Sequence, residues 1–155
     1  MPRRFPPKLP AHVHPSPTMP DNELTLLGRS ETSLPEAPSP DILEAFPNPK
    51  PGRRYTIQLD CPEFSSLCPV TGQPDAARIE IRYVPDERII ETKSLKFYLA
   101  SYRNHAGFNE SIANAILDDF VSVCSPHEME VNARFAPRGG IQLTVEAHHP
   151  DPPVA

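Results

Sequence analysis

The sequence lacks several features that would place the protein in a large functional class. It contains no apolar run near the roughly 20 residues that a membrane helix needs, and its first residues lack the apolar stretch of a signal peptide. We therefore expect no membrane partner and a cytoplasmic location. The formal net charge is -5, whereas a nucleic-acid-binding domain usually carries a basic face. Direct binding to nucleic acid is not expected.

Cysteines and glycine-rich motifs are also scarce. The three cysteines, Cys61, Cys68 and Cys124, are odd in number and lack the paired spacing of zinc ligands. Neither a disulfide framework nor a metal site is therefore predicted, and at least one cysteine is a candidate working thiol. The sequence contains no G-x-G-x-x-G or G-x-x-x-x-G-K motif, so a glycine-rich phosphate loop is not expected.

The distribution of proline divides the chain. Thirteen of the 22 prolines lie within the first 51 residues, and residues 1–22 combine proline with almost no periodic apolar pattern. We expect a disordered, Pro-rich tail at 1–22, one domain at 23–149 and a short C-terminal tail at 150–155.

Apolar periodicity within the domain predicts an α+β fold. Alternation with a period of two predicts four strands, at 55–61, 79–83, 129–135 and 141–147, the last two joined by a turn at Arg138-Gly139-Gly140. Apolar residues at helical spacing predict two helices, around 95–102 and 112–124. The order strand, strand, helix, helix, strand, strand is typical of an antiparallel sheet with both helices on one face.

The connection between the first two predicted strands carries a candidate site. Residues 62–75 are far more than the about two to five residues of a usual hairpin loop, and long loops are often functional. Three prolines and one glycine restrict the backbone, so Cys68 and Asp75 could be held in a fixed relation. A thiolate attacks electrophilic carbon, and Asp75 could accept the thiol proton. Spacing alone leaves open that Cys68 is a buried apolar residue and Asp75 a turn residue.

Four segments resemble one enzyme family. Residues 62–75 (PEFSSLCPVTGQPD) closely resemble the active-site segment of the QueF nitrile reductases. Residues 91–98 (ETKSLKFY) resemble the family's second signature, which is associated with NADPH, and 101–105 (SYRNH) continue it. Residues 108–110 (FNE) and 137–140 (PRGG) also match, so the resemblance runs from about Leu24 to Ile141.

This resemblance implies a fold, an assembly and a reaction. The fold would be a tunnelling fold, whose small antiparallel sheets join around a ring of subunits with active sites at the interfaces. A decamer of two stacked pentamers would be expected. The reaction would be reduction of the nitrile of 7-cyano-7-deazaguanine to an aminomethyl group with two NADPH, in queuosine biosynthesis for tRNA modification.

The resemblance also assigns roles to individual residues. Cys68 would add to the nitrile to form a thioimide, and Asp75 would transfer protons. The ring of the substrate would be bound by Glu110 and by Glu91, with the backbone of Ile90 and Thr92 beside it. Lys93, Lys96 and Arg138 are candidates for the NADPH phosphates, because phosphates need cationic partners.

One departure from the family pattern is Asn109, where the family usually has histidine. Asparagine does not titrate near neutral pH, although it still donates and accepts hydrogen bonds to a substrate. Its type also suits the N-cap of the second predicted helix. Two rival functions stay open: an amidine-forming relative that acts on deazaguanine already within tRNA, and a binding protein with impaired turnover.

Overall fold

The computed structural model describes residues 33–151; the predicted tail at 1–22, residues 23–32 of the predicted domain and residues 152–155 lie outside the described residues. The elements in chain order are a 3-10 turn η1 (Pro40–Ile42), β1 (Ala45–Pro47), β2 (Ile57–Leu67), β3 (Pro74–Val84), β4 (Arg88–Ile90), α1 (Thr92–Ser101), a 3-10 turn η2 (Tyr102–Asn104), α2 (Asn109–Cys124), β5 (Glu128–Phe135) and β6 (Thr144–His149). Two helices and antiparallel sheets confirm the predicted α+β class.

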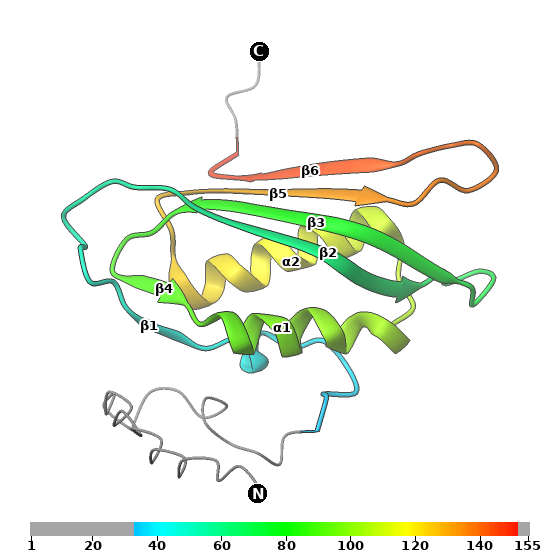
Figure 1. Cartoon of the computed structure of the whole chain (residues 1–155), viewed down its shortest axis with the longest axis horizontal. Helices are drawn as coiled ribbons and strands as arrows, with labels where there is room; N and C mark the ends of the chain where they lie inside the picture. The colour runs from blue at the N-terminus through cyan, green and yellow to red at the C-terminus, as the bar shows by residue number, and fades with distance from the viewer. Residues whose placement is uncertain (1–32, 152–155) are drawn as a thin grey trace, which may run out of the picture.

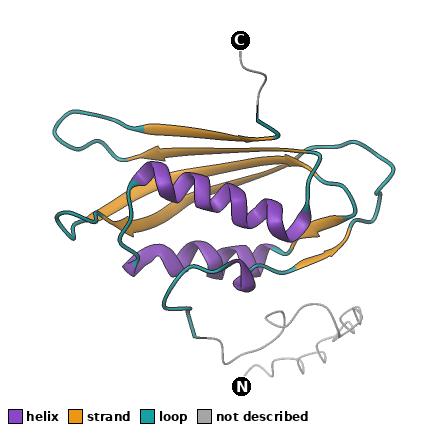
Figure 2. Ribbon diagram, turned by 180° about the vertical axis from the view of Figure 1, so that it is seen from behind, coloured by secondary structure: helices purple, strands orange, loops and turns teal. Residues whose placement is uncertain are grey.

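The main sheet has the strand order β2-β3-β5-β6, with every neighbouring pair antiparallel. Both helices lie on the same face of this sheet (Figures 1 and 2). Along β3, alternate residues from Asp75 to Tyr83 are buried, whereas Arg78 and Arg82 are exposed. The period of two therefore separates a core face from a face in water, as the sequence predicted.

Packing between β3 and α2 fixes the position of the second helix. Ile79 and Ile81 of β3, and Ile116 and Phe120 of α2, have no exposed surface. The ring of Phe120 contacts Tyr83 edge-on, with the ring centroids 4.9 Å apart. Full burial of each such side chain stabilises the fold by roughly 1.5–3 kcal/mol, so the helix is held firmly on the sheet.

Two short strands were not predicted. β1 and β4 form a separate two-stranded sheet, in which Ala45 pairs with Ile90. A strand of three residues is too short to show an alternating pattern. The structure therefore contains more elements than the six that were predicted, but those six follow one another in the predicted order.

The fourth strand begins later than predicted. β6 starts at Thr144, whereas Ile141 is 76% exposed and lies in the preceding turn. Arg138 and Ile141 exchange two backbone hydrogen bonds of 3.0 Å, and Gly139 and Gly140 both have positive φ. The predicted turn is therefore present, but it is longer than expected.

Within residues 33–151, no helix combines the length and apolar character needed to cross a membrane.

Candidate active site at one end of the sheet

The connection between β2 and β3 is a compact turn at 68–73. The expected long loop at 62–75 is wrong, because β2 continues to Leu67 after a register shift between Cys61 and Phe64. The N–H of Cys68 donates to the Gln73 carbonyl, and the N–H of Gly72 donates to the Cys68 carbonyl, both at 2.9 Å. Gly72 has a φ of 66°, which glycine adopts without steric cost. These contacts fix the backbone at Cys68.

The thiol of Cys68 is the most acidic of the three cysteine thiols. A hydrogen bond with the Thr71 side chain, followed by backbone hydrogen bonds from Thr71 and Val70 and one from the Arg138 side chain, lowers its pKa to about 7. Burial raises the pKa of Cys61 and raises that of Cys124 to about 12. Because the thiolate is the nucleophilic form, Cys68 is the cysteine prepared for attack at neutral pH.

Asp75 lies beside this turn and pairs with Arg138. Asp75 is the second residue of β3 and is 8% exposed. Its Oδ1 is 2.8 Å from Nε of Arg138, whose Nη2 donates to the Pro74 carbonyl at 2.7 Å. The N–H of Ala136 donates to the Ala76 carbonyl, and this bond holds the chain after β5 beside this end of β3. Arg138, predicted as a phosphate ligand, therefore contacts both Asp75 and the Cys68 thiol.

The segment before α2 is hydrogen-bonded to the same end of the sheet. The N–H of Leu67 donates to the His105 carbonyl at 2.9 Å, and the N–H of Gly107 donates to the Leu67 carbonyl at 3.1 Å. These bonds hold the segment that leads into Asn109 and Glu110 next to the residue that precedes Cys68. Glu110 is exposed in the first helical turn, where the helix dipole favours a negative charge.

Asn109 occupies a different helical position from the one expected. The N-cap of α2 is Phe108, and Asn109 is the first helical residue, so the predicted capping role is wrong. The Oδ1 atom of Asn109 is buried and has no hydrogen-bond partner among the described residues. A buried acceptor without a partner is uncommon in a folded protein.

Glu91 and its neighbours form a second group, at the start of α1. Ile90 ends β4 and is buried, and Thr92 begins the helix. Glu91 is 6% exposed and is the N-cap: its Oε1 accepts from the Lys93 N–H at 2.8 Å and its Oε2 from the Ser94 N–H at 2.7 Å. The sequence interpretation missed this structural role, which an oxygen-bearing side chain just before a helical pattern signals.

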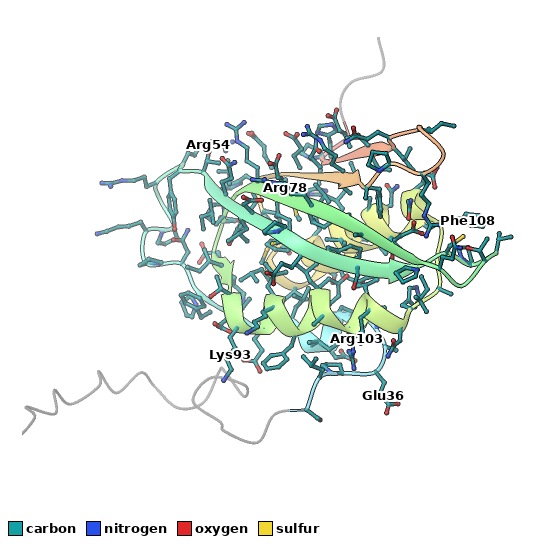
Figure 3. The ribbon with its side chains drawn as sticks, turned by 45° about the vertical axis from the view of Figure 1, so that its right-hand side comes forward. Glu36, Arg54, Arg78, Lys93, Arg103 and Phe108 are labelled. Carbon is teal, nitrogen blue, oxygen red and sulfur yellow. The ribbon has the colours of Figure 1, made fainter. Side chains whose placement is uncertain are left out.

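The two groups lie at opposite ends of the molecule. In Figure 3, Lys93 near the start of α1 and Phe108 near the start of α2 lie on opposite sides. The ten residues of α1 alone span about 15 Å at 1.5 Å per residue. The structure therefore brings Cys68, Asp75 and Arg138 into contact and holds the segment before α2 beside Leu67. No contact joins Asn109 or Glu110 to these three residues among the described interactions, and Ile90, Glu91, Thr92 and Lys93 lie apart from them.

A cavity of about 440 Å³ lies between α1 and β2. Leu95 and Leu99 of α1 and Phe64 of β2 supply apolar walls, and Thr92 and Lys96 also line it. Asp60 and Glu63 of β2 add two carboxylates to the same lining. Lys96 is exposed, so its ammonium is available at this cavity.

Comparison with known proteins identifies the family of the chain. The family model described as QueF-like protein matches residues 74–154. A protein of Anaeromyxobacter sp. strain K named NADPH-dependent 7-cyano-7-deazaguanine reductase is 52% identical over 120 residues, which are 77% of this chain and 98% of that protein. A protein of the same name from Bacillus subtilis strain 168 is 49% identical, over 77% of this chain and 73% of the relative.

A solved structure resembles the fold. The apo form of the archaeosine synthase QueF-Like superposes with a TM-score of 0.57 at 19% identity, over 64% of this chain and 96% of that one. At this identity the likeness concerns the fold alone. The family match covers more than half of the chain, and about half of the aligned residues are identical to those of the relatives; the chain belongs to the QueF family.

Proposed function

We propose that the protein reduces the nitrile of 7-cyano-7-deazaguanine to the aminomethyl group with two NADPH, in queuosine biosynthesis. The observation that carries this proposal is the Cys68 thiol, with its pKa lowered to about 7, beside the ion pair of the buried Asp75 and the exposed Arg138. The names of relatives that are about half identical support the substrate and the cofactor.

The first step is addition of the Cys68 sulfur to the nitrile carbon. An S–C bond forms, one π bond of the nitrile breaks, and the nitrogen takes up a proton through Asp75 to give a thioimide. Asp75 supports this role because it is the second residue of β3, close after the turn that carries Cys68. Each of two NADPH molecules, bound in turn, would supply one hydride to this carbon: the first would reduce the thioimide and the second the imine that remains after the sulfur has left.

Between the two reductions the Cys68 sulfur leaves as a thiolate. Its low pKa makes it a good leaving group as well as a nucleophile at neutral pH. Asp75 returns protons to the nitrogen as negative charge develops there. The Arg138 guanidinium holds the Asp75 carboxylate and also contacts the thiol, so one residue orients both reacting groups.

The proposed ligands of the substrate ring are carboxylates from the two separate groups of site residues. Glu110 and the buried amide of Asn109 lie at the Cys68 end. Glu91, with the backbone of Ile90 and Thr92, contacts the donor-rich edge of the ring; a carboxylate has about four lone-pair sites, so capping α1 leaves acceptors for the ligand.

Lys93 and Lys96 are the proposed ligands of the NADPH phosphates. Lys96 lines the cavity between α1 and β2, together with the carboxylates of Asp60 and Glu63, whereas Lys93 lies outside that lining; the proposal therefore rests on their positive charge. Arg138 was a third candidate, but its contacts with Asp75 and Cys68 favour the role described above.

A ring of subunits would unite the two groups of residues. Because α1 separates Glu91 from Cys68 within one chain, we propose that each site takes its Cys68 end from one subunit and its Glu91 end from a neighbour. β2 and β6 are the edge strands of the main sheet and each has one neighbour within the described residues. Pairing of these edges would close a pentamer, and two pentamers would stack into a decamer. The proposed location is the cytoplasm.

Incubation with the nitrile tests the proposal. We expect the intact mass of the protein to increase by the mass of the substrate, with the adduct on Cys68, and two NADPH to be oxidised per nitrile consumed. Cys68→Ala should abolish both results. The matched control is Cys124→Ala, at the far end of α2, which should retain both.

Other outcomes would favour the rival functions. An adduct without NADPH oxidation would identify a binding protein with impaired turnover. Consumption of ammonia with tRNA-borne deazaguanine, without NADPH, would identify the amidine-forming reaction. Unchanged NADPH oxidation by Cys68→Ala would contradict the mechanism.

A further inference from the structure

A buried hydroxyl normally makes a hydrogen bond, but the hydroxyl of Ser66 makes none within the described residues. Ser66 is fully buried, and its Oγ has no hydrogen-bond partner among the described residues. Burial of an unpaired hydroxyl destabilises a fold, whereas alanine at the same place would carry no such cost. This position therefore calls for an explanation other than stability.

Ser66 lies directly opposite Asp75. The two residues are register partners in the β2–β3 pairing, and directly opposed residues of an antiparallel pair have their Cβ atoms about 4.5–5.5 Å apart on one face of the sheet. Both side chains are buried on the face that carries the helices. A rotation of the Ser66 hydroxyl therefore brings it toward the Asp75 carboxyl group.

The ion pair with Arg138 provides Asp75 with hydrogen-bond donors but with no acceptor for the proton of its carboxylic acid form. The recorded ion pair of Asp75 is between Oδ1 and Nε of Arg138. A guanidinium donates hydrogen bonds but cannot accept one, so Arg138 stabilises the carboxylate and not the carboxylic acid. A serine hydroxyl can do both, because it donates to a carboxylate and accepts from a protonated carboxyl group.

We propose that Ser66 is a positioning residue for Asp75, whose hydroxyl rotates to donate to the carboxylate and to accept from the acid form. The role rests on the proposed function, in which Asp75 gains and loses protons in each turnover. No bond to Ser66 forms or breaks; its proton stays on the hydroxyl while the direction of the hydrogen bond reverses. Its full burial keeps water from taking this place.

Several charged or titratable groups surround this position. They are Cys68 in the turn, Arg138 after β5, His105 before α2 and Glu110 in the first turn of α2. Arg138 pairs with Asp75, and a substitution at Ser66 leaves all four groups in place. The effect of Ser66 is therefore measured as a change against this constant background.

The test compares Ser66→Ala with Ser65→Ala, a neighbouring serine on the opposite face of β2 whose register partner is Ala76. Steady-state NADPH oxidation is measured from pH 5 to 9, with thioimide formation followed by mass and unfolding followed in urea. We expect Ser66→Ala to unfold at the same or a higher urea concentration, yet to lose about tenfold in kcat. The pH profile of kcat should also change, because Asp75 loses a partner that can both donate and accept a hydrogen bond.

Two further variants show whether Ser66 has a positioning role. Ser66→Thr retains the hydroxyl and should restore the pH profile, and Ser65→Ala should match the wild type. A Ser66→Ala protein with the wild-type kcat and pH profile would overturn the positioning role while leaving the proposed function intact. Absence of a thioimide in the wild type would instead overturn the proposed function, and the role of Ser66 with it.

Discussion

At the scale of single residues, the reactivity of Cys68 depends on its immediate neighbours. Its pKa is lowered first of all by the side chain of Thr71, three residues along the same turn. The sequence motif identified Cys68 and Asp75, but the contacts of Thr71 and Arg138 require the turn geometry and the return of the chain after β5. Such contacts between segments leave no periodic signal in a sequence.

Alkylation kinetics should reveal this low pKa. A cysteine reacts as its thiolate, which is populated above the pKa, so the rate at Cys68 should rise with pH around a midpoint of about 7. Thr71→Val removes the largest stabilising contact and should move this midpoint to higher pH. Iodoacetamide labelling followed by peptide mass spectrometry measures both midpoints; an unchanged midpoint in Thr71→Val would contradict the assigned cause.

Replacement of Asn109 by histidine tests the departure from the family pattern. The Asn109 amide is partly buried and its Oδ1 lacks a partner among the described residues. Histidine would add a group that titrates near neutral pH, so kcat should be preserved or should rise. Stopped assays of NADPH oxidation at pH 6 to 8 measure the change. A clear decrease would show that asparagine has a role of its own.

At the scale of secondary structure, periodicity predicted the long elements and missed the short ones. β3 and β5 alternate between the core and water over at least eight residues each, which makes the period of two visible. β1 and β4 have three residues each, and Pro62 lies within β2 at a register shift. Proline usually marks the end of a strand, so Pro62 led to the prediction of a long loop.

The contact between α2 and the sheet provides a stability prediction. Phe120 has no exposed surface and contacts the ring of Tyr83. Phe120→Ala should reduce the free energy of unfolding by about 3–5 kcal/mol, since it leaves a large cavity. Asp118→Ala, on the same helix at an exposed position, is the control and should change it by less than about 0.5 kcal/mol. Urea unfolding monitored by circular dichroism measures both values.

At the scale of the whole molecule, the predicted site residues divide between two places: the junction of β4 and α1 and the connection of β2 and β3 lie on opposite sides of the molecule (Figure 1). A sequence motif identifies such residues without showing whether they meet within one chain or across an interface. That information depends on the length and direction of α1, which begins beside β4 and ends near the Cys68 turn.

Co-expression of two inactive variants should restore activity if neighbouring chains share a site. Cys68→Ala lacks the nucleophile and Glu91→Gln lacks a carboxylate of the ring site. A mixed ring contains sites with an intact Cys68 end from one chain and an intact Glu91 end from the other, in about a quarter of random interfaces. NADPH oxidation should therefore recover to about that fraction of the wild-type rate. No recovery in a mixed assembly verified by mass would contradict a shared site.

The double role of Glu91 has a consequence for the motion of α1. Its two carboxylate oxygens hold the amides of Lys93 and Ser94, so the group proposed to recognise the base also closes the first helical turn. A bound base would restrict the carboxylate and reduce the local opening of that turn. The amide hydrogens of these two residues should then exchange with deuterium more slowly when the ligand is present.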